Sequence, residues 1–274
     1  MFKHKLNLGL IDFINCLPIN HCLLKWNIEN LSIIKSYPSD INDLMREGRI
    51  DIAPVSSIEY LNNLDNYVLI ENACISSDGE VCSVVLFSRY NLEELEFKRI
   101  GLPYTSNTSI ELLKIILNEH GINLKNIEFK AHRYQDTVEN MLSEGYDALL
   151  FIGDPALVAR IQCQNKLKCF DLGQLWKELT GYPMTFGCWI ARLEWKSQHE
   201  DDFLRFCLLL DKAVDEGMNV YFNEVADEAS KRLNLNRSYI EDYLGSKIKY
   251  GFGLEHAKGL QLFKNLYDKL KHDK

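Results

Sequence analysis

The chain has 274 residues, of which 46% are hydrophobic and 26% charged, and its formal net charge is -8. This length allows one large domain or two smaller ones, and the composition is that of an ordinary globular protein. Because the net charge is strongly negative, the surface repels nucleic acids and anionic membranes, and neither is expected as a partner. An anionic ligand must therefore be attracted by a local field of positive sign.

Eight cysteines are spread along the chain, most of them inside apolar runs, as Cys82 and Cys207 are. A chain of this length does not need disulfides, so buried free thiols in a reducing compartment are expected. No Cys-x-x-Cys pair and no His-x-x-x-His spacing occurs, so no metal site is expected. No apolar stretch of signal-peptide or membrane-spanning length is present, and the expected location is the cytoplasm.

The first part of the chain alternates between strand and helix patterns. In chain order, the expected elements are a strand at 6–11, a turn into a helix at 12–18, a helix at 39–47, a strand at 50–55, a helix at 56–61 and a strand at 81–88. The helix at 39–47 has Ser39 as its expected N-cap and Gly48 after its end. The run at 81–88 is nearly all apolar and β-branched, which is typical of a strand buried on both faces.

A second series of the same kind starts near residue 98. Its expected elements are strands at 99–102, 127–130, 147–152 and 186–192, helices at 108–119 and 136–144, and a helix that begins at Pro155 with Asp154 as N-cap. After residue 192 the pattern is mainly helical.

The alternation of strands and helices predicts an α/β fold with mostly parallel sheets flanked by helices. Because the series restarts near residue 95 and returns near residue 187, two lobes are expected, joined by two crossing strands. The first lobe comprises residues 1–93 and 188–274, including the C-terminal helices, and the second comprises residues 94–187, with a ligand cleft between them. A single doubly wound domain is the simpler alternative.

Three junctions between a strand and the following helix carry small polar residues. The candidate binding residues at these junctions are Ser56, Ser57, Ser106, Asn107, Thr108, Ser109, Gly153 and Asp154. Such junctions lie where open α/β sheets bind ligands, and they present unpaired N–H groups and the positive end of a helix dipole. Helix capping alone also explains each of these junctions. At the third junction Asp154 favours capping over ligand binding, because its carboxylate would repel an anion. The run of five small polar residues at 105–109 exceeds what one cap needs and favours ligand binding.

Motifs for other chemistries are missing from the chain. Neither Gly-x-Gly-x-x-Gly nor Gly-x-x-x-x-Gly-Lys-Ser/Thr occurs, and Gly-x-Ser-x-Gly is absent too. No histidine stands in a recognisable triad spacing, so no catalytic base is apparent. No cofactor is expected. Asn15, in a tight turn, and Ser83, in an apolar strand, are polar residues whose usual roles would be to bond nearby backbone groups.

Six segments carry a resemblance to a known family. They are Ile14-Asn15-Cys16-Leu17-Pro18; residues 51–60, from Asp51 to Tyr60; Ile75-Ser76-Ser77-Asp78-Gly79, running on to residues 83–88; Thr105-Ser106-Asn107-Thr108-Ser109; residues 150–157, from Leu150 to Leu157; and residues 171–176 together with residues 180–189. In these segments the sequence resembles the chorismate dehydratases of the futalosine route to menaquinone.

The resemblance implies a two-lobed, periplasmic-binding-protein-like fold of type II. It implies a carbon–oxygen lyase that eliminates water from chorismate, a small dicarboxylate, to give 3-[(1-carboxyvinyl)oxy]benzoate. By the same resemblance Asn15 and Ser83 are the residues used on the substrate in binding and catalysis. A non-catalytic binding protein for a small carboxylate, or the sensing domain of a regulator, would share the architecture without the reaction.

Overall fold

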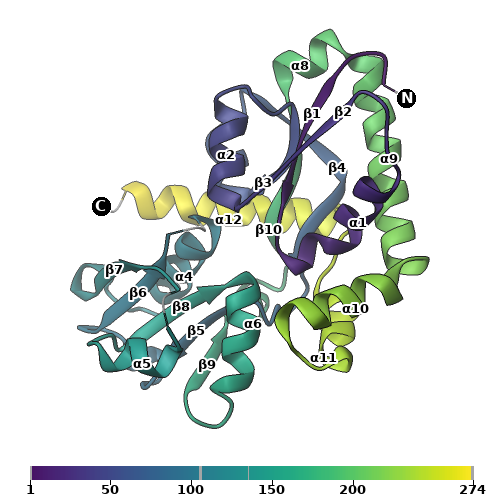
Figure 1. Ribbon diagram of the computed structural model, residues 1–274. Helices are drawn as coiled ribbons and strands as arrows, with labels where there is room; N and C mark the ends of the chain where they lie inside the picture. Colours follow the sequence, from purple (N-terminus) through teal and green to yellow (C-terminus); the bar gives the residue numbers. More distant parts are fainter. Residues whose placement is uncertain (1, 105–106, 135, 273–274) are drawn as a thin grey trace. The chain divides into compact units, whose positions relative to one another are not determined.

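The structure is a computed structural model that describes residues 2–104, 107–134 and 136–272 (Figure 1). The chain forms two compact units. The first comprises residues 1–76 and 185–254, and the second comprises residues 77–184 and 255–274. Each unit has one five-stranded sheet with helices packed against it. Within the described ranges, no helix combines the length and the apolar character that a membrane crossing requires.

The sheet of the first unit has the order β2-β1-β3-β10-β4. Its strands are β1 (Leu6–Ile11), β2 (Leu31–Ser36), β3 (Ile52–Ser56), β4 (Tyr67–Ser77) and β10 (Met184–Arg192). Strand β1 runs parallel to β2 and to β3, whereas β10 runs antiparallel to β3. The carboxyl ends of β1 and β3 therefore lie at the edge where β10 begins.

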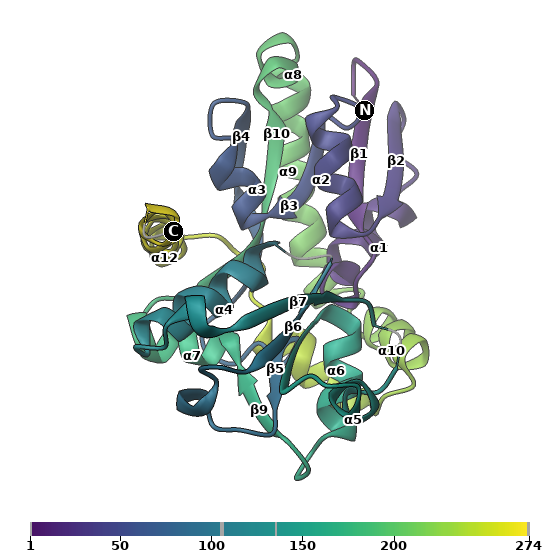
Figure 2. The same ribbon diagram turned by 90° about the vertical axis from the view of Figure 1, so that its left-hand side faces the viewer.

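Helices cover both faces of this sheet. They are α1 (Leu17–Lys25), α2 (Pro38–Arg46), α3 (Ser57–Asn62), α8 (Leu193–Gln198), α9 (Glu200–Asn219), α10 (Phe222–Leu233) and α11 (Arg237–Asp242). Helix α2 lies on one face and α9 on the other (Figures 1 and 2). The buried side chain of Ile41 on α2 packs over Gly9, where a Cβ would lie 3.3 Å from its Cδ1. The amphipathic pattern of residues 39–47 thus buries its apolar side on the sheet.

The sheet of the second unit has the order β7-β6-β8-β5-β9. Its strands are β5 (Val84–Ser88), β6 (Arg99–Pro103), β7 (Glu128–His132), β8 (Ala148–Ile152) and β9 (Lys168–Asp171). Strand β6 is parallel to β7 and β8, whereas β5 is antiparallel to both β8 and β9. The carboxyl ends of β6, β8 and β9 consequently share one edge with the start of β5.

Four helices of the second unit follow its strands β6 to β9, and the fifth, α12, is the last helix of the chain. They are α4 (Asn107–Glu119), α5 (Val138–Ser143), α6 (Gly153–Gln162), α7 (Leu172–Thr180) and α12 (Leu254–His272). Alternate residues of β5 and β8, among them Phe87 and Phe151, form one apolar cluster with buried residues of α5 and α6. On α7, the indole of Trp176 meets the ring of Phe263 edge-on, with ring centroids 5.8 Å apart. This contact packs the C-terminal helix α12 against the second unit.

The α/β class predicted from the sequence is confirmed, and both sheets are mixed because β10 and β5 run against their neighbours. The division into units differs from the predicted one in two places. Strand β5 pairs with β8 and β9 of the second sheet, so the first unit ends at Ser76 rather than at residue 93. Helix α12 packs on α7, so the C-terminal helices divide between the two units.

Several predicted helix starts differ from the structure by one or two residues, among them those of α2 and α6. Helix α2 begins at Pro38 with Tyr37 as N-cap, instead of at Ser39, because proline suits the first turn of a helix. Helix α6 begins at Gly153 with Ile152 as N-cap, so Asp154 lies inside the first turn and is not the cap.

His132 at the end of β7 predicts a pH dependence of stability. Its ring is buried against Tyr134, Tyr146 and Phe151, and its Nε2 lies 3.1 Å from the Leu150 carbonyl oxygen. Burial lowers the pKa of His132, although its backbone hydrogen bonds oppose the shift. As pH falls below about 6.5, the unfolded chain therefore takes up the proton first, and stability is lost.

We expect His132→Gln to weaken the fall in melting temperature between about pH 6.5 and about pH 5, measured by circular dichroism. The matched variant His120→Gln changes an exposed histidine of the same unit and should keep the wild-type slope. An unchanged slope in His132→Gln would contradict the assignment.

Candidate functional site

Asn15 follows the carboxyl end of β1 in the first unit. It lies in a single 3₁₀ turn, Ile14–Cys16, which passes directly into α1. Pro18 sits in the first turn of α1, where its missing N–H costs no hydrogen bond, and this fixes the helix start close to Asn15. The Asn15 Oδ1 is buried and has no hydrogen-bond partner among the residues that the structure describes. Because most buried polar atoms in proteins are hydrogen-bonded, this oxygen is an available acceptor for a donor from a ligand or a water molecule.

Several further buried polar atoms of the first unit lack a partner among the described residues, and three of them concern this edge: Asn42 Oδ1, Thr185 Oγ1 and the Tyr250 hydroxyl. Asn42 bonds Ser56 at the end of β3, and Thr185 lies near the start of β10, close to the Gly187–Ser56 pair. Burial, and in second place the nearby Cys16 thiol, raise the pKa of Tyr250 well above its usual range. These unpaired atoms belong to segments that meet at the sheet edge of Asn15 and Ser56.

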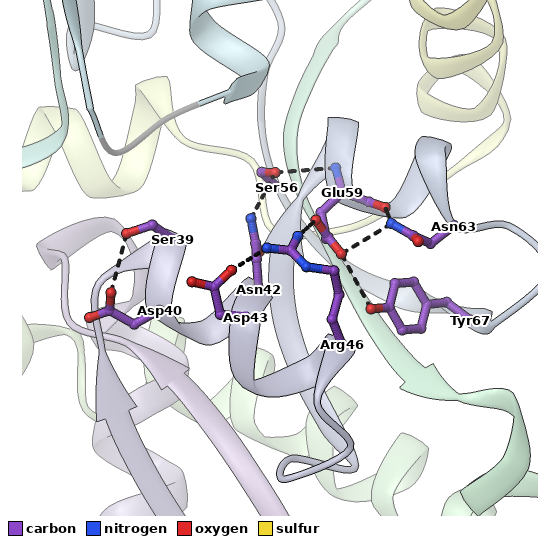
Figure 3. A network of polar contacts seen from close by, with 9 residues as sticks. All are labelled: Ser39, Asp40, Asn42, Asp43, Arg46, Ser56, Glu59, Asn63 and Tyr67. Carbon is purple, nitrogen blue, oxygen red and sulfur yellow. Dashed lines mark hydrogen bonds and ion pairs between the residues drawn. The ribbon is translucent and has the colours of Figure 1, made fainter. Parts of the chain in front are cut away.

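Ser56 caps α3 as the sequence predicts, and its hydroxyl proton has no acceptor among the residues that the structure describes. Its Oγ accepts from the backbone N–H of Glu59 at 3.3 Å and from the Asn42 Nδ2 at 3.3 Å (Figure 3). A hydroxyl has two acceptor positions and one proton, so two accepted bonds leave the proton to donate. A carboxylate is the natural acceptor for such a donor at a helix N-terminus.

The side chain of Glu59 turns away from the cap and anchors α3 to α2 and β4. It contacts Arg46, and its Oε1 accepts from Asn63 at 3.1 Å and from the Tyr67 hydroxyl at 3.3 Å (Figure 3). Burial raises the pKa of Glu59, and the charge of Arg46 opposes this shift. Burial, followed by the charge of Glu59, raises the pKa of Tyr67 to about 12. This network holds the helix that Ser56 begins.

Ser57, the next residue, is fully buried. Its Oγ donates to the backbone oxygen of Thr185 at 2.6 Å and lies 3.7 Å from the Cys188 Sγ. This hydroxyl links α3 to β10, and its only proton is already donated to Thr185. Both facts favour a structural role for Ser57.

The structure brings Ser83, Gly153 and Asp154 together at one edge of the second sheet. Val84 pairs with Ile152, and just beyond this pair the Gly153 N–H donates to the Ser83 carbonyl oxygen at 2.7 Å. Gly153 has a φ of 61°, which a residue with a Cβ rarely adopts. Both Ser83 and Asp154 are buried.

The small polar run at 105–109 follows β6 and leads into α4. Ser106 lies outside the described residues. Asn107 is the first residue of α4 and is exposed, whereas Thr108 and Ser109 are buried in its first turn. Since β6 is parallel to β8, the N-termini of α4 and α6 follow the same edge of the sheet.

Four residues near these edges are not predicted as site residues from the sequence: Asn42, Thr185, Tyr250 and Asp171. The fold brings Asn42, Thr185 and Tyr250 to this edge, and no local sequence pattern indicates it. Asp171 and Thr185 occur only as residues of one matching segment, and the position of Asp171 before Leu172-Gly173 is also that of a helix N-cap.

One set of potential metal ligands exists among the described residues, formed by Glu80, Cys82 and Asp171, whose ligand atoms lie within 4.8 Å of one another. The guanidinium of Arg160 pairs with both Glu80 and Asp171. A cation already neutralises these carboxylates, so the set does not indicate a metal site.

Comparison with known proteins identifies the family of this chain and proteins with a similar fold. A family model described as menaquinone biosynthesis matches residues 6–269. The chorismate dehydratase of Thermus thermophilus is 28% identical over 271 residues, which cover 93% of each chain.

Among solved structures, a protein of Archaeoglobus fulgidus is similar with a TM-score of 0.80, 16% identity and coverage of 99% of both chains. The periplasmic aliphatic sulphonate binding protein of Escherichia coli gives a TM-score of 0.71 at 16% identity, over 98% of this chain and 88% of that one. At such identities the likeness concerns the fold, which is that of the periplasmic binding proteins.

The family match extends from β1 to the last turns of α12 and so includes every candidate residue named above. It agrees with the resemblance carried by the six sequence segments. The chain belongs to the menaquinone biosynthesis family.

Proposed function

We propose that this protein is a chorismate dehydratase, a lyase that removes water from chorismate to give 3-[(1-carboxyvinyl)oxy]benzoate in the futalosine route to menaquinone. The family and the named relative from Thermus thermophilus support the substrate. The observation that carries the proposal is the buried Asn15 Oδ1, which lacks a partner among the described residues. An acceptor at this position suits the hydroxyl group that chorismate loses.

Chorismate carries two carboxylates, which suit helix N-termini with small polar residues. The Ser56 hydroxyl, with both acceptor positions occupied, donates its proton to one carboxylate. The candidate holders in the second unit are Ser106, Asn107, Thr108 and Ser109 at α4 and Gly153 and Asp154 at α6. Such donors work without a net positive charge on the protein, in keeping with its charge of -8.

The proposed reaction needs no protein base. The ring proton at C3 is activated through the conjugated ring carboxylate, and donors on that carboxylate stabilise the charge that develops there. The substrate's own enolpyruvyl carboxylate takes the C3 proton and passes it to the departing hydroxyl, which leaves as water. The ring becomes aromatic, which drives the step. Asn15 orients the hydroxyl, and Ser83 bonds a carboxylate.

The eight cysteines are all free thiols, which supports a reducing compartment and hence the proposed location in the cytoplasm. The second candidate function is a non-catalytic binding protein for a small carboxylate. It is favoured by the structural likeness to sulphonate-binding proteins, which hold a small anion.

One assay separates these two functions. We expect incubation of the purified protein with chorismate to give an aromatic ultraviolet spectrum and a product lighter by one water, identified by mass spectrometry. Heat-denatured protein is the control. Binding of chorismate in calorimetry without any product would replace the dehydratase by the binding protein.

A further inference from the structure

Ser83 follows a tight turn with a strained central residue. Its N–H donates to the Val81 carbonyl oxygen at 2.7 Å, which closes a three-residue turn around Cys82. Cys82 has a φ of 61°, in the left-handed region that is costly for a residue with a Cβ. A three-residue turn with a positive central φ is the rare and strained form of the γ-turn. Such strain persists only where surrounding contacts hold it.

The carboxylate of Asp171, at the end of β9, holds this turn. Its Oδ1 accepts from the backbone N–H of Val81 at 3.0 Å, and its Oδ2 accepts from that of Cys82 at 2.7 Å. Asp171 is only 8% exposed, so little water competes for these bonds. The two N–H groups that precede Ser83 are therefore fixed by one side chain from a different strand.

Asp171 is itself immobilised by two helices. Its Oδ1 also accepts from the N–H groups of Gly173 and Gln174, at 3.0 and 3.1 Å, which caps α7. Arg160 on α6 donates to its Oδ2 at 3.1 Å and pairs with Glu80 inside the turn segment. Because five donors converge on this carboxylate, it has no freedom to follow a displaced turn.

Close packing also fixes the turn at Val81 and Cys82. A Cβ on Gly173 would lie 2.6 Å from the Gly79 carbonyl oxygen and 2.6 Å from the Ser77 Oγ. The segment before Ser83 thus rests directly on the backbone of α7. On its other side, the Ser83 carbonyl accepts the Gly153 N–H that begins α6.

We propose that Asp171 is a positioning residue, which holds the strained turn at Val81 and Cys82 and so fixes the backbone and the hydroxyl direction of Ser83. This inference rests on the proposed function, in which Ser83 acts on chorismate. Arg160 serves the same purpose one step further away, because it fixes the Asp171 carboxylate.

The test begins with Asp171→Asn, which keeps the size of the side chain. One carboxylate oxygen becomes an NH₂ group that faces backbone donors, so the turn loses at least one of its bonds. We expect kcat for chorismate to fall about tenfold to a hundredfold, as for a reacting group displaced by about 1 Å. Amide hydrogen exchange at Cys82 and Ser83 should become faster.

The decisive measurement repeats Asp171→Asn in a Ser83→Ala background. If Asp171 acts through Ser83, the second change lowers the melting temperature as before but leaves the residual kcat unchanged. A further fall of about tenfold in that background would show a general effect on the fold and overturn the inference, as would wild-type kcat in Asp171→Asn alone. If the wild-type protein does not convert chorismate, the proposed function itself fails, and the inference falls with it.

Two more variants keep the inference testable if Asp171→Asn fails to fold. Arg160→Gln leaves the four backbone bonds of the carboxylate and removes the cation that pairs with Asp171 and Glu80, so we expect a smaller loss of kcat with the same dependence on Ser83. Asp147→Asn is the matched control, because Asp147 accepts the Arg99 N–H at 2.8 Å at the opposite end of β8. It should lower the melting temperature without changing kcat. Equal kcat in Arg160→Gln and wild type, or an equal loss of kcat in Asp147→Asn, would contradict the inference.

Discussion

Asn15→Ala and Ser83→Ala are each expected to lower kcat for chorismate by about a hundredfold or more, in a protein that still folds. Alanine removes from Asn15 the amide whose buried Oδ1 has no other partner among the described residues. It removes from Ser83 the hydroxyl that the turn at Cys82 orients. Both changes delete a group expected to touch the substrate, and the measurement is the initial rate of aromatic product formation with circular dichroism of each variant.

Matched controls exist in the same two units. Ser88→Ala changes a buried serine at the other end of β5, whose Oγ accepts the Tyr90 N–H at 2.9 Å. Asn30→Ala removes a side chain that bonds the Phe2 carbonyl oxygen at 2.8 Å, before β2. Both should retain near wild-type kcat. Near wild-type rates in Asn15→Ala and Ser83→Ala would instead remove these two residues from the proposed site.

A third substitution, Asn15→Asp, tests whether a substrate carboxylate lies close to Asn15. Asn15→Asp has nearly the same shape but brings a negative charge toward a substrate with two carboxylates. We expect a higher KM in addition to the lower kcat, because like charges repel strongly where water is excluded. An unchanged KM would mean that the substrate carboxylates lie far from Asn15.

Local patterns in the sequence predicted the elements well where the signal is contained in the segment itself. Strand β1 has the predicted bounds, and Ser56 caps α3 through the Glu59 N–H as its spacing indicates. The failures concern choices between distant partners. The apolar run that forms β5 would suit either sheet, and an amphipathic helix such as α12 does not specify which unit covers its apolar side. Strands β2, β4 and β9 were not predicted at all.

The candidate site, like the fold, was predicted from the sequence only in part. Asn15 and Ser83 were identified by a family resemblance, whereas spacing alone gave each of them an ordinary backbone role. The contacts that prepare Ser83 join Asp171 to residues 90 and 89 positions earlier in the chain. No periodicity or capping rule operates over such separations, so only the folded chain reveals them. The positive φ of Cys82 is equally hidden, because cysteine carries no sequence signal for that conformation.

Gly217→Ala is expected to destabilise the first unit by about 1–3 kcal/mol or more, because it overpacks the contact between α9 and α1. A Cβ on Gly217 would lie 2.3 Å from the Pro18 carbonyl oxygen and 2.7 Å from its carbonyl carbon. Backbone atoms cannot rotate away as a flexible side chain can, so one helix must move. The measurement is the free energy of unfolding from a denaturant titration. Gly251→Ala is the control, since nothing lies within 4 Å of its added Cβ.

The same substitution also tests how Asn15 is held. Pro18 lies in the first turn of α1, which continues directly from the 3₁₀ turn of Asn15, so a displaced α1 carries Asn15 with it. We therefore expect kcat to fall in Gly217→Ala even at temperatures where the protein remains folded. If α9 moves instead and leaves α1 in place, stability falls and kcat stays at the wild-type value. That result would show that the strand β1 and the turn after it position Asn15 without help from the helix packing behind them.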